Sequence, residues 1–247
     1  MFTPFDLPMG ILLLVTDQLA ASADFILHRA LQEHLRPTKT AEQPARVHKR
    51  KAIILSVSEP LARWKVLAAK SNVRLDAPTF RFIDVFARVS DGGTLRPVLD
   101  DVVSALGDGE ETDTLVMVDD LAVLSWLGTV PALDQVRFVR ALAAVCHKAG
   151  ATLLIRHHVL GFGSQAEDAP ALRTLQQCCT FHLEVLPLAS GRSGAVSGQV
   201  ALHAGPATAR GEGGVRLLPR SAALQYKLAD GPAGTVFFER GTAGSVL

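Results

Sequence analysis

Short runs of apolar residues, each followed by a segment with helical periodicity, constrain the fold of this chain more than any other feature. The runs lie at residues 10–16, 52–57, 80–85, 114–120 and 151–155. A run that is apolar at nearly every position indicates a strand buried on both faces, which is typical of a parallel sheet. Because parallel strands need long crossover connections, the helical segments between the runs fit the same fold. We therefore expect a mostly parallel sheet flanked by helices.

Helical periodicity predicts the segments that connect these strands. The expected helices cover residues 22–35, 61–70, 95–106, 121–126 and 130–147. Pro60 is suited to the start of the second helix, and Gly107 is placed to end the third. The alternation of strand and helix predicts the α/β class, with right-handed crossovers between parallel strands.

The last third of the chain has a different pattern. Short strand candidates lie at residues 181–188, 196–203, 216–218, 224–228 and 235–239, and glycine-rich breaks separate them. This spacing predicts antiparallel hairpins at the C-terminal edge of the sheet. The composition never shifts sharply enough to indicate a boundary, so we expect residues 1–247 to form a single domain.

Residues 36–51 interrupt the alternating pattern. This segment contains two prolines, six Lys or Arg residues and a single acidic residue, with almost no apolar side chains. Such a composition predicts a mobile basic loop on the surface. The run Lys49-Arg-Lys51 allows contact with RNA or a role in nuclear import. Short basic runs are more often only solvated, and no aromatic residue is interleaved here for base stacking.

Overall composition excludes several classes of protein. The 247 residues are 48% hydrophobic and 20% charged, which is incompatible with a mostly disordered chain. The formal charge of +1 disfavours binding to nucleic acid through overall charge, although local patches remain open. The three cysteines include no Cys-x-x-Cys pair, so neither a disulfide framework nor a zinc ribbon is expected. No apolar run is long enough to span a membrane and no Lys or Arg precedes Arg29, so we expect a soluble intracellular protein without a signal peptide.

The turn after the first expected strand lacks the residues that bind nucleotide phosphates. A phosphate-binding loop needs glycines, whose backbone N–H groups converge on the phosphates, together with a Lys and a Ser or Thr for magnesium. Here the turn reads Thr16-Asp-Gln-Leu-Ala-Ala-Ser-Ala23, without glycine or lysine, and Asp17 would repel a triphosphate. The first basic side chain, Arg29, lies about two turns inside the following helix. We therefore predict no nucleotide cofactor and interpret Ser22 as a helix cap.

Two acidic residues close the expected strand at residues 114–120. The stretch Val116-Met-Val-Asp-Asp120 resembles the second nucleotide motif, in which an acid after an apolar strand holds magnesium. Without the first motif, such an acid has no bound nucleotide to act on. Because Asp is among the preferred helix caps, our favoured interpretation is that Asp119 or Asp120 caps the helix that follows.

The segment Arg156-His-His158 follows the strand predicted to end at Ile155. Open α/β sheets bind ligands at the carboxyl ends of their strands, and a glycine-containing loop follows at residues 161–165. Two adjacent histidines could bind a metal, but no third ligand is evident nearby. Contact with RNA or a partner and an ordinary solvated loop therefore both remain open. No Gly-x-Ser-x-Gly motif occurs, and we predict no catalytic, cofactor-binding or metal-binding residue.

Several stretches together resemble the Elongator complex subunit 6 family. Leu115-Val-Met-Val-Asp-Asp-Leu-Ala-Val-Leu-Ser-Trp-Leu-Gly128 resembles the family's Asp-Asp-Leu-Ser-Leu-Leu segment, and Ser197-Gly-Gln-Val-Ala-Leu202 resembles its late Gly-Gln-Leu strand. Leu224-Gln-Tyr-Lys-Leu228 and Val236-Phe-Phe-Glu-Arg-Gly-Thr242 resemble its closing hairpin. The resemblance runs in the right order from about Gly10 to the C-terminus and includes a first turn without phosphate-loop residues.

This resemblance implies a RecA-like fold that has lost the ATPase motifs. It also implies a non-catalytic subunit of a hetero-hexameric ring with Elongator subunits 4 and 5. Such a ring binds tRNA, docks on the catalytic Elongator subcomplex and supports modification of the wobble uridine of tRNA. The expected location is the cytoplasm, with the nucleus as a second one.

By analogy with RecA-like rings, the loop after Ile155 would face the central pore. Arg156, His157 and His158 are then candidate RNA contacts, and Arg192 in a later loop is a further candidate. The alternative is a divergent RecA-like or phosphate-loop enzyme that hydrolyses nucleotides, and an ATPase-derived adaptor outside Elongator is a third hypothesis. The enzyme needs a cation near the β- and γ-phosphates, which Arg29 lies too deep in its helix to supply.

Overall fold

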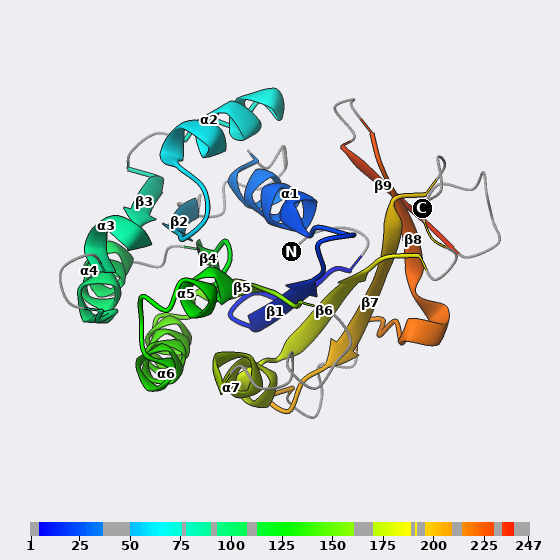
Figure 1. Cartoon of the computed structure of the whole chain (residues 1–247). Helices are drawn as coiled ribbons and strands as arrows, with labels where there is room; N and C mark the ends of the chain where they lie inside the picture. Colours follow the sequence, from blue (N-terminus) through cyan, green and yellow to red (C-terminus); the bar gives the residue numbers. More distant parts are fainter. Residues whose placement is uncertain are drawn as a thin grey trace.

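A computed structural model describes residues 5–36, 50–75, 78–89, 93–107, 113–160, 170–188, 191, 196–208, 214–229 and 234–239. Within these residues, nine strands form one sheet in the order β3-β2-β4-β5-β1-β6-β7-β8-β9 (Figure 1). The strands are β1 (Leu12–Asp17), β2 (Arg50–Ser56), β3 (Phe80–Asp84), β4 (Asp113–Val118), β5 (Thr152–His158), β6 (Phe181–Leu186), β7 (Gly198–Ala204), β8 (Leu224–Leu228) and β9 (Thr235–Phe238). The helices are α1 (Asp24–Leu35), α2 (Leu61–Lys70), α3 (Val85–Val89), α4 (Arg96–Leu106), α5 (Ala122–Trp126), α6 (Ala132–Lys148) and α7 (Pro170–Cys178), with a short 3-10 helix, η2 (Arg220–Ala222).

Strands β1 to β6 are parallel, and β7 to β9 extend the sheet as antiparallel strands. This arrangement confirms the predicted α/β class and is compatible with a RecA-like fold. The prediction places the strand at residues 181–188 among the antiparallel hairpins. In this detail it is wrong, because β6 pairs in parallel with β1 and is antiparallel only to β7. The segment at residues 216–218 contributes a single bridge between Leu218 and Leu202 rather than a strand.

The helices follow the predicted boundaries closely. α2 occupies the predicted residues, and Gly107 ends α4 with a φ of 74°, a conformation that favours glycine. α3, which begins directly after β3, is absent from the prediction. Among the described helices, none combines the length and the apolar character needed to cross a membrane.

The predicted basic loop at residues 36–51 falls mostly outside the described residues. Where the structure describes its end, the prediction is wrong, because Arg50 and Lys51 are the first residues of β2. Both pair in register with β4, so the strand begins two positions before its apolar run.

Helices cover both faces of the sheet and create two hydrophobic cores. On one face α1 and α2 pack against the sheet, and Leu13 and Val15 of β1 belong to that core. On the other face α3 to α7 pack against it, and Leu12 and Leu14 belong to the second core. Figure 1 shows α1 and α2 on one side of the sheet and α5 to α7 on the other. β1 is apolar at consecutive positions because side chains on both of its faces are removed from water.

The topology brings the ends of three central strands to one edge of the sheet. Asp17, at the end of β1, pairs in register with His158, at the end of β5. Val118, at the end of β4, pairs with Ile155 of β5. The turns that follow β1 and β4 therefore lie on either side of the end of β5, and the polar residues at these ends form the candidate site.

Gly205 makes a close backbone approach that leaves no room for a side chain. A Cβ atom at this position would lie 2.1 Å from the carbonyl oxygen of Cys179 and 2.7 Å from its Sγ atom. We expect Gly205→Ala to lower the free energy of unfolding by about 1–3 kcal/mol, because the chain after β7 would have to move. Gly214→Ala is the matched control, since a Cβ there has no neighbour within 4 Å. Urea denaturation should separate the two variants, and equal midpoints would contradict the close approach.

Candidate functional site

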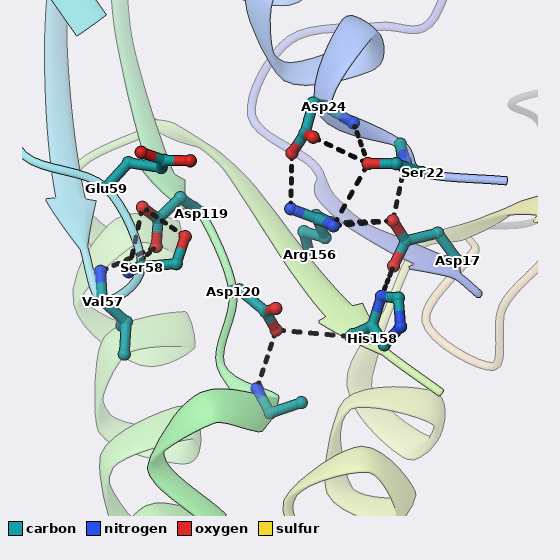
Figure 2. Close-up of polar contacts among 12 residues, drawn as sticks. Asp17, Ser22, Asp24, Val57, Ser58, Glu59, Asp119, Asp120, Arg156 and His158 are labelled. Carbon is teal, nitrogen blue, oxygen red and sulfur yellow. Dashed lines mark hydrogen bonds and ion pairs between the residues drawn. The ribbon is translucent and has the colours of Figure 1, made fainter. Parts of the chain in front are cut away.

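Asp17, the last residue of β1, lies at the centre of a buried polar cluster (Figure 2). Its side chain is 0% exposed. Oδ2 accepts hydrogen bonds from the backbone N–H of Ala23 at 2.6 Å and from Nε of Arg156 at 2.9 Å. Oδ1 lies 2.9 Å from Nδ1 of His158. A buried carboxylate is costly unless donors surround it, and here the donors come from β5 and from the turn before α1.

Arg156 of β5 neutralises the Asp17 carboxylate. Besides the bond from Nε, its Nη2 atom lies 2.8 Å from Oδ2 of Asp17, and its Nη1 atom lies 2.6 Å from Oδ1 of Asp24. The guanidinium thus joins β5, β1 and the first turn of α1 (Figure 2). The Arg156 side chain is 9% exposed and that of Asp24 is 53% exposed, so the pair with Asp17 is the buried one.

The charges in this cluster stabilise one another. Burial alone would raise the pKa of Asp17, but the hydrogen bond from His158 and the charge of Arg156 outweigh it, so the pKa falls below its ordinary value of 3.8. Burial alone would lower the pKa of Arg156, but the charges of Asp17 and Asp24 raise it above its ordinary value. Asp17 is therefore ionised at neutral pH, and because an ionised carboxylate only accepts hydrogen bonds, Nδ1 of His158 is assigned as the donor.

The turn between β1 and α1 is held by side chains at the start of the helix. Oγ of Ser22 accepts a hydrogen bond from the backbone N–H of Asp24 at 3.3 Å and donates one to Oδ2 of Asp24 at 2.7 Å. The prediction that Ser22 caps this helix is wrong, because the N-cap position is Ala23 and Ser22, one residue earlier, contacts only the first residue within the helix. Because Asp17 binds the N–H of Ala23, its negative charge lies near the positive end of the helix dipole. Nucleotide-binding proteins place a phosphate at this position of a strand–turn–helix unit.

Asp119, directly after β4, joins the ends of β4 and β2. Its carboxylate accepts hydrogen bonds from the backbone N–H groups of Val57 at 2.7 Å and Ser58 at 3.3 Å, and from the hydroxyl groups of Ser56 and Ser58. The residue is 2% exposed. Both carboxylate oxygens are therefore committed to the turn between β2 and α2 (Figure 2). The sequence analysis missed this contact because Val57 and Asp119 are far apart along the chain.

Asp120 is the acid that meets the start of α5. Its Oδ1 atom accepts a hydrogen bond from the backbone N–H of Ala122, the first residue of α5, at 3.0 Å. It also lies 3.4 Å from the backbone nitrogen of His158. Of the two acids predicted to cap this helix, Asp120 therefore makes the contact. Burial raises the pKa of Asp120, and the charge of Arg156 offsets this only in part.

The structure places three of the four predicted RNA contacts within a strand. The expectation that Arg156, His157 and His158 belong to a loop after Ile155 is wrong, because β5 continues to His158. These three residues are 8%, 4% and 5% exposed. The strand continues because Asp17, on the neighbouring strand, supplies a buried partner for the two polar side chains that share its face. Arg192 lies outside the described residues, and RNA contact by any of the four stays a prediction.

A second polar cluster lies on β6 and β7. Glu184 accepts hydrogen bonds from Nε and Nη2 of Arg220 at 2.8 and 2.7 Å. Nε2 of His203, on β7, lies 2.7 Å from Oε2 of Glu184. His182 places Nε2 2.7 Å from the hydroxyl of Thr16. Burial alone would raise the pKa of Glu184, but the hydrogen bonds from Arg220 help lower it to about 2. Alternating polar residues on β6 are the sequence signal that could have indicated this cluster.

The site carries no recognisable catalytic arrangement among the described residues. No group of His, Cys, Asp and Glu in the described ranges is arranged to hold a metal ion. The ring nitrogens of His157 have no hydrogen-bond partner among the described residues, and burial lowers its pKa to about 4. His157 is therefore neutral at pH 7. Asp17 is paired with Arg156, and the carboxylates of Asp119 and Asp120 accept hydrogen bonds from backbone N–H groups, which is typical of a structural cluster.

Comparison with known proteins finds a relative of this chain among Elongator subunits. No protein-family model matches the chain. The chain is 29% identical over 173 residues to a human protein described as Elongator complex protein 6. The matched region covers 66% of this chain and 60% of the human protein, so the chain matches less than two thirds of the length of that relative. This similarity supports the resemblance to the Elongator subunit 6 family found in the sequence motifs.

Replacing Asp17 tests the buried ion pair. We expect Asp17→Ala to lower the free energy of unfolding by about 3 kcal/mol, because Arg156 would keep only the half-exposed Asp24 as its partner. The control is Asp113→Ala, which removes a pair with Arg50 at 3.8 Å between side chains that are 32% and 30% exposed. That control should cost at most about 1 kcal/mol. Equal losses for the two variants in urea denaturation would contradict the buried pair.

The lowered pKa of Glu184 predicts a pH dependence of stability. A carboxyl group whose pKa falls on folding stabilises the native state above its ordinary pKa, and this stability is lost as the pH falls. For Glu184 the loss occurs between pH 4.5 and about 2. Because Arg220 is 57% exposed, we expect about 1–2 kcal/mol after screening by solvent.

The comparison is between the wild type and Glu184→Gln, by urea denaturation at pH 7, 5 and 3. Glu184→Gln should lose less stability than the wild type as the pH falls. Asp100→Asn, which removes an exposed pair with Arg96, should follow the wild-type curve. Parallel curves for wild type and Glu184→Gln would show that this carboxylate is not stabilised by its neighbours.

Proposed function

We propose that this chain is a non-catalytic subunit of an Elongator complex. The observation that carries the proposal is the 29% identity to human Elongator complex protein 6 over 173 residues. The motifs at residues 115–128, 197–202 and 224–242 point to the same family, and the mixed sheet is compatible with the RecA-like fold expected of it.

Contacts at the ends of the central strands, where a nucleotide would bind, support a subunit without catalytic activity. The turn after β1 contains neither glycine nor lysine, and its acid, Asp17, binds the N–H of Ala23 that a phosphate would need. Arg29 is the first cation after β1. Its Nη1 atom donates a hydrogen bond to the carbonyl oxygen of Thr235 in β9 at 3.0 Å, so the side chain is directed toward β9. Asp119, which follows β4 as a magnesium-binding acid would, is bound to backbone and hydroxyl donors instead. These contacts favour a structural role over nucleotide hydrolysis.

Within the complex, we assign the chain to a hetero-hexameric ring with Elongator subunits 4 and 5. The ring would bind tRNA and dock on the catalytic subcomplex, and so support modification of the wobble uridine. The proposed location is the cytoplasm, with the nucleus as a second one. Contact of RNA with Arg156, His157 or His158 would require the end of β5 to open, because these residues are buried and two of them bind Asp17.

The proposal predicts the partners of the chain in its native cells. A tagged copy should recover two RecA-like partners in stoichiometric amounts, identified by mass spectrometry, in a particle whose mass fits a hetero-hexamer. A mock purification from untagged cells is the control. Recovery of the chain alone, or with unrelated partners only, would refute membership of an Elongator complex.

A further inference from the structure

The surroundings of Asp17 have the composition of an oxyanion site. A backbone N–H at the start of α1, a buried guanidinium and an imidazole nitrogen converge on one carboxylate, at distances of 2.6 to 2.9 Å. Guanidinium groups and helix N-termini are the groups that proteins use to bind carboxylates and phosphates. The carboxylate they bind here comes from the chain itself.

We infer that Ala23, Arg156 and His158 form an anion-binding site that Asp17 fills permanently. The site takes a small oxyanion of carboxylate size when the side chain of Asp17 is absent. In the wild type, Asp17 keeps external anions out, because its carboxylate occupies the donors and is 0% exposed. The inference deepens the proposed lack of nucleotide binding, since the filled site lies in the turn where a phosphate-binding loop would be.

The geometry explains why the donors would remain available without Asp17. The backbone of Arg156 is held on both sides, because it pairs in register with Val15 of β1 and its carbonyl oxygen accepts a hydrogen bond from the N–H of Leu121 at 3.0 Å. Without Asp17 the guanidinium keeps two partners: Asp24, which approaches Nη1 and is itself held by the hydroxyl of Ser22 at 2.7 Å, and Oγ of Ser22, which accepts from Nη2 at 3.4 Å. Nε and Nη2 would therefore keep their direction toward the space vacated by the carboxylate. A buried guanidinium that has lost its buried counter-charge favours uptake of an anion from solution.

The test is anion rescue of Asp17→Ala, measured as the melting temperature in sodium formate and in sodium chloride at equal ionic strength. Formate is chosen because it reproduces the carboxylate that the substitution removes. At a formate concentration about tenfold above its Kd, we expect the melting temperature of the variant to rise by about 3–6 °C over the chloride value. The rise should saturate with formate concentration, as binding at one site requires.

Two controls separate binding at this site from general salt effects. The wild type should show no difference between formate and chloride, because Asp17 occupies the donors. The double variant Asp17→Ala/Arg156→Met should also show none, because it lacks the guanidinium. A formate effect of the same size in all three proteins would overturn the inference.

A poorly folded Asp17→Ala protein would still give a result. Refolding from urea should then recover native protein in formate and not in chloride, and Asp17→Ser, which also vacates the carboxylate position, should behave in the same way. Failure of formate to act on both variants would overturn the inference. Because these measurements use the isolated chain, their outcome is independent of which partners are recovered from cells.

Discussion

The ion pair between Asp17 and Arg156 determines how the two central strands β1 and β5 end and how α1 begins. Asp17 contributes a buried negative charge at the end of β1, and Arg156 of β5 supplies the positive charge that neutralises it. The same carboxylate binds the N–H of Ala23 before α1, and the same guanidinium reaches Asp24 in its first turn. A charge buried at the end of a strand would be costly alone, so each of these groups depends on the others. The edge of the sheet is consequently closed by internal contacts.

The elements that are apolar and local could be predicted from the sequence, whereas contacts between distant charges could not. The apolar run of β1 and the periodicity of α2 indicated both elements, because burial and helix geometry leave a pattern in neighbouring residues. β5 was expected to stop at Ile155, where the apolar run ends, because nothing local shows that Arg156 meets an acid 139 positions away. Asp119 and Asp120 illustrate the two cases: the contact of Asp120 with Ala122 is local and was expected, whereas the bonds of Asp119 to the turn after β2 are not local and were not expected.

A nucleotide-hydrolysing enzyme needs free donors for phosphates and a free acid for magnesium at this edge. Here the N–H of Ala23 is bound by Asp17, and the carboxylate of Asp119 is bound by Val57, Ser56 and Ser58. The same fold can therefore exist without a nucleotide site, because here the polar groups at the ends of the central strands bind one another and stabilise the fold. This agrees with the similarity to an Elongator subunit, for which we propose a role in assembly rather than in chemistry.

We propose that the chain's own carboxylates leave no place for a nucleotide. Equilibrium binding of fluorescent ATP with magnesium to the purified chain tests this most directly. A phosphate-loop ATPase measured under the same conditions shows that the assay detects binding. We predict no saturable change in fluorescence for this chain at micromolar nucleotide. Saturable micromolar binding that unlabelled ATP displaces would contradict the account and favour a divergent nucleotide enzyme.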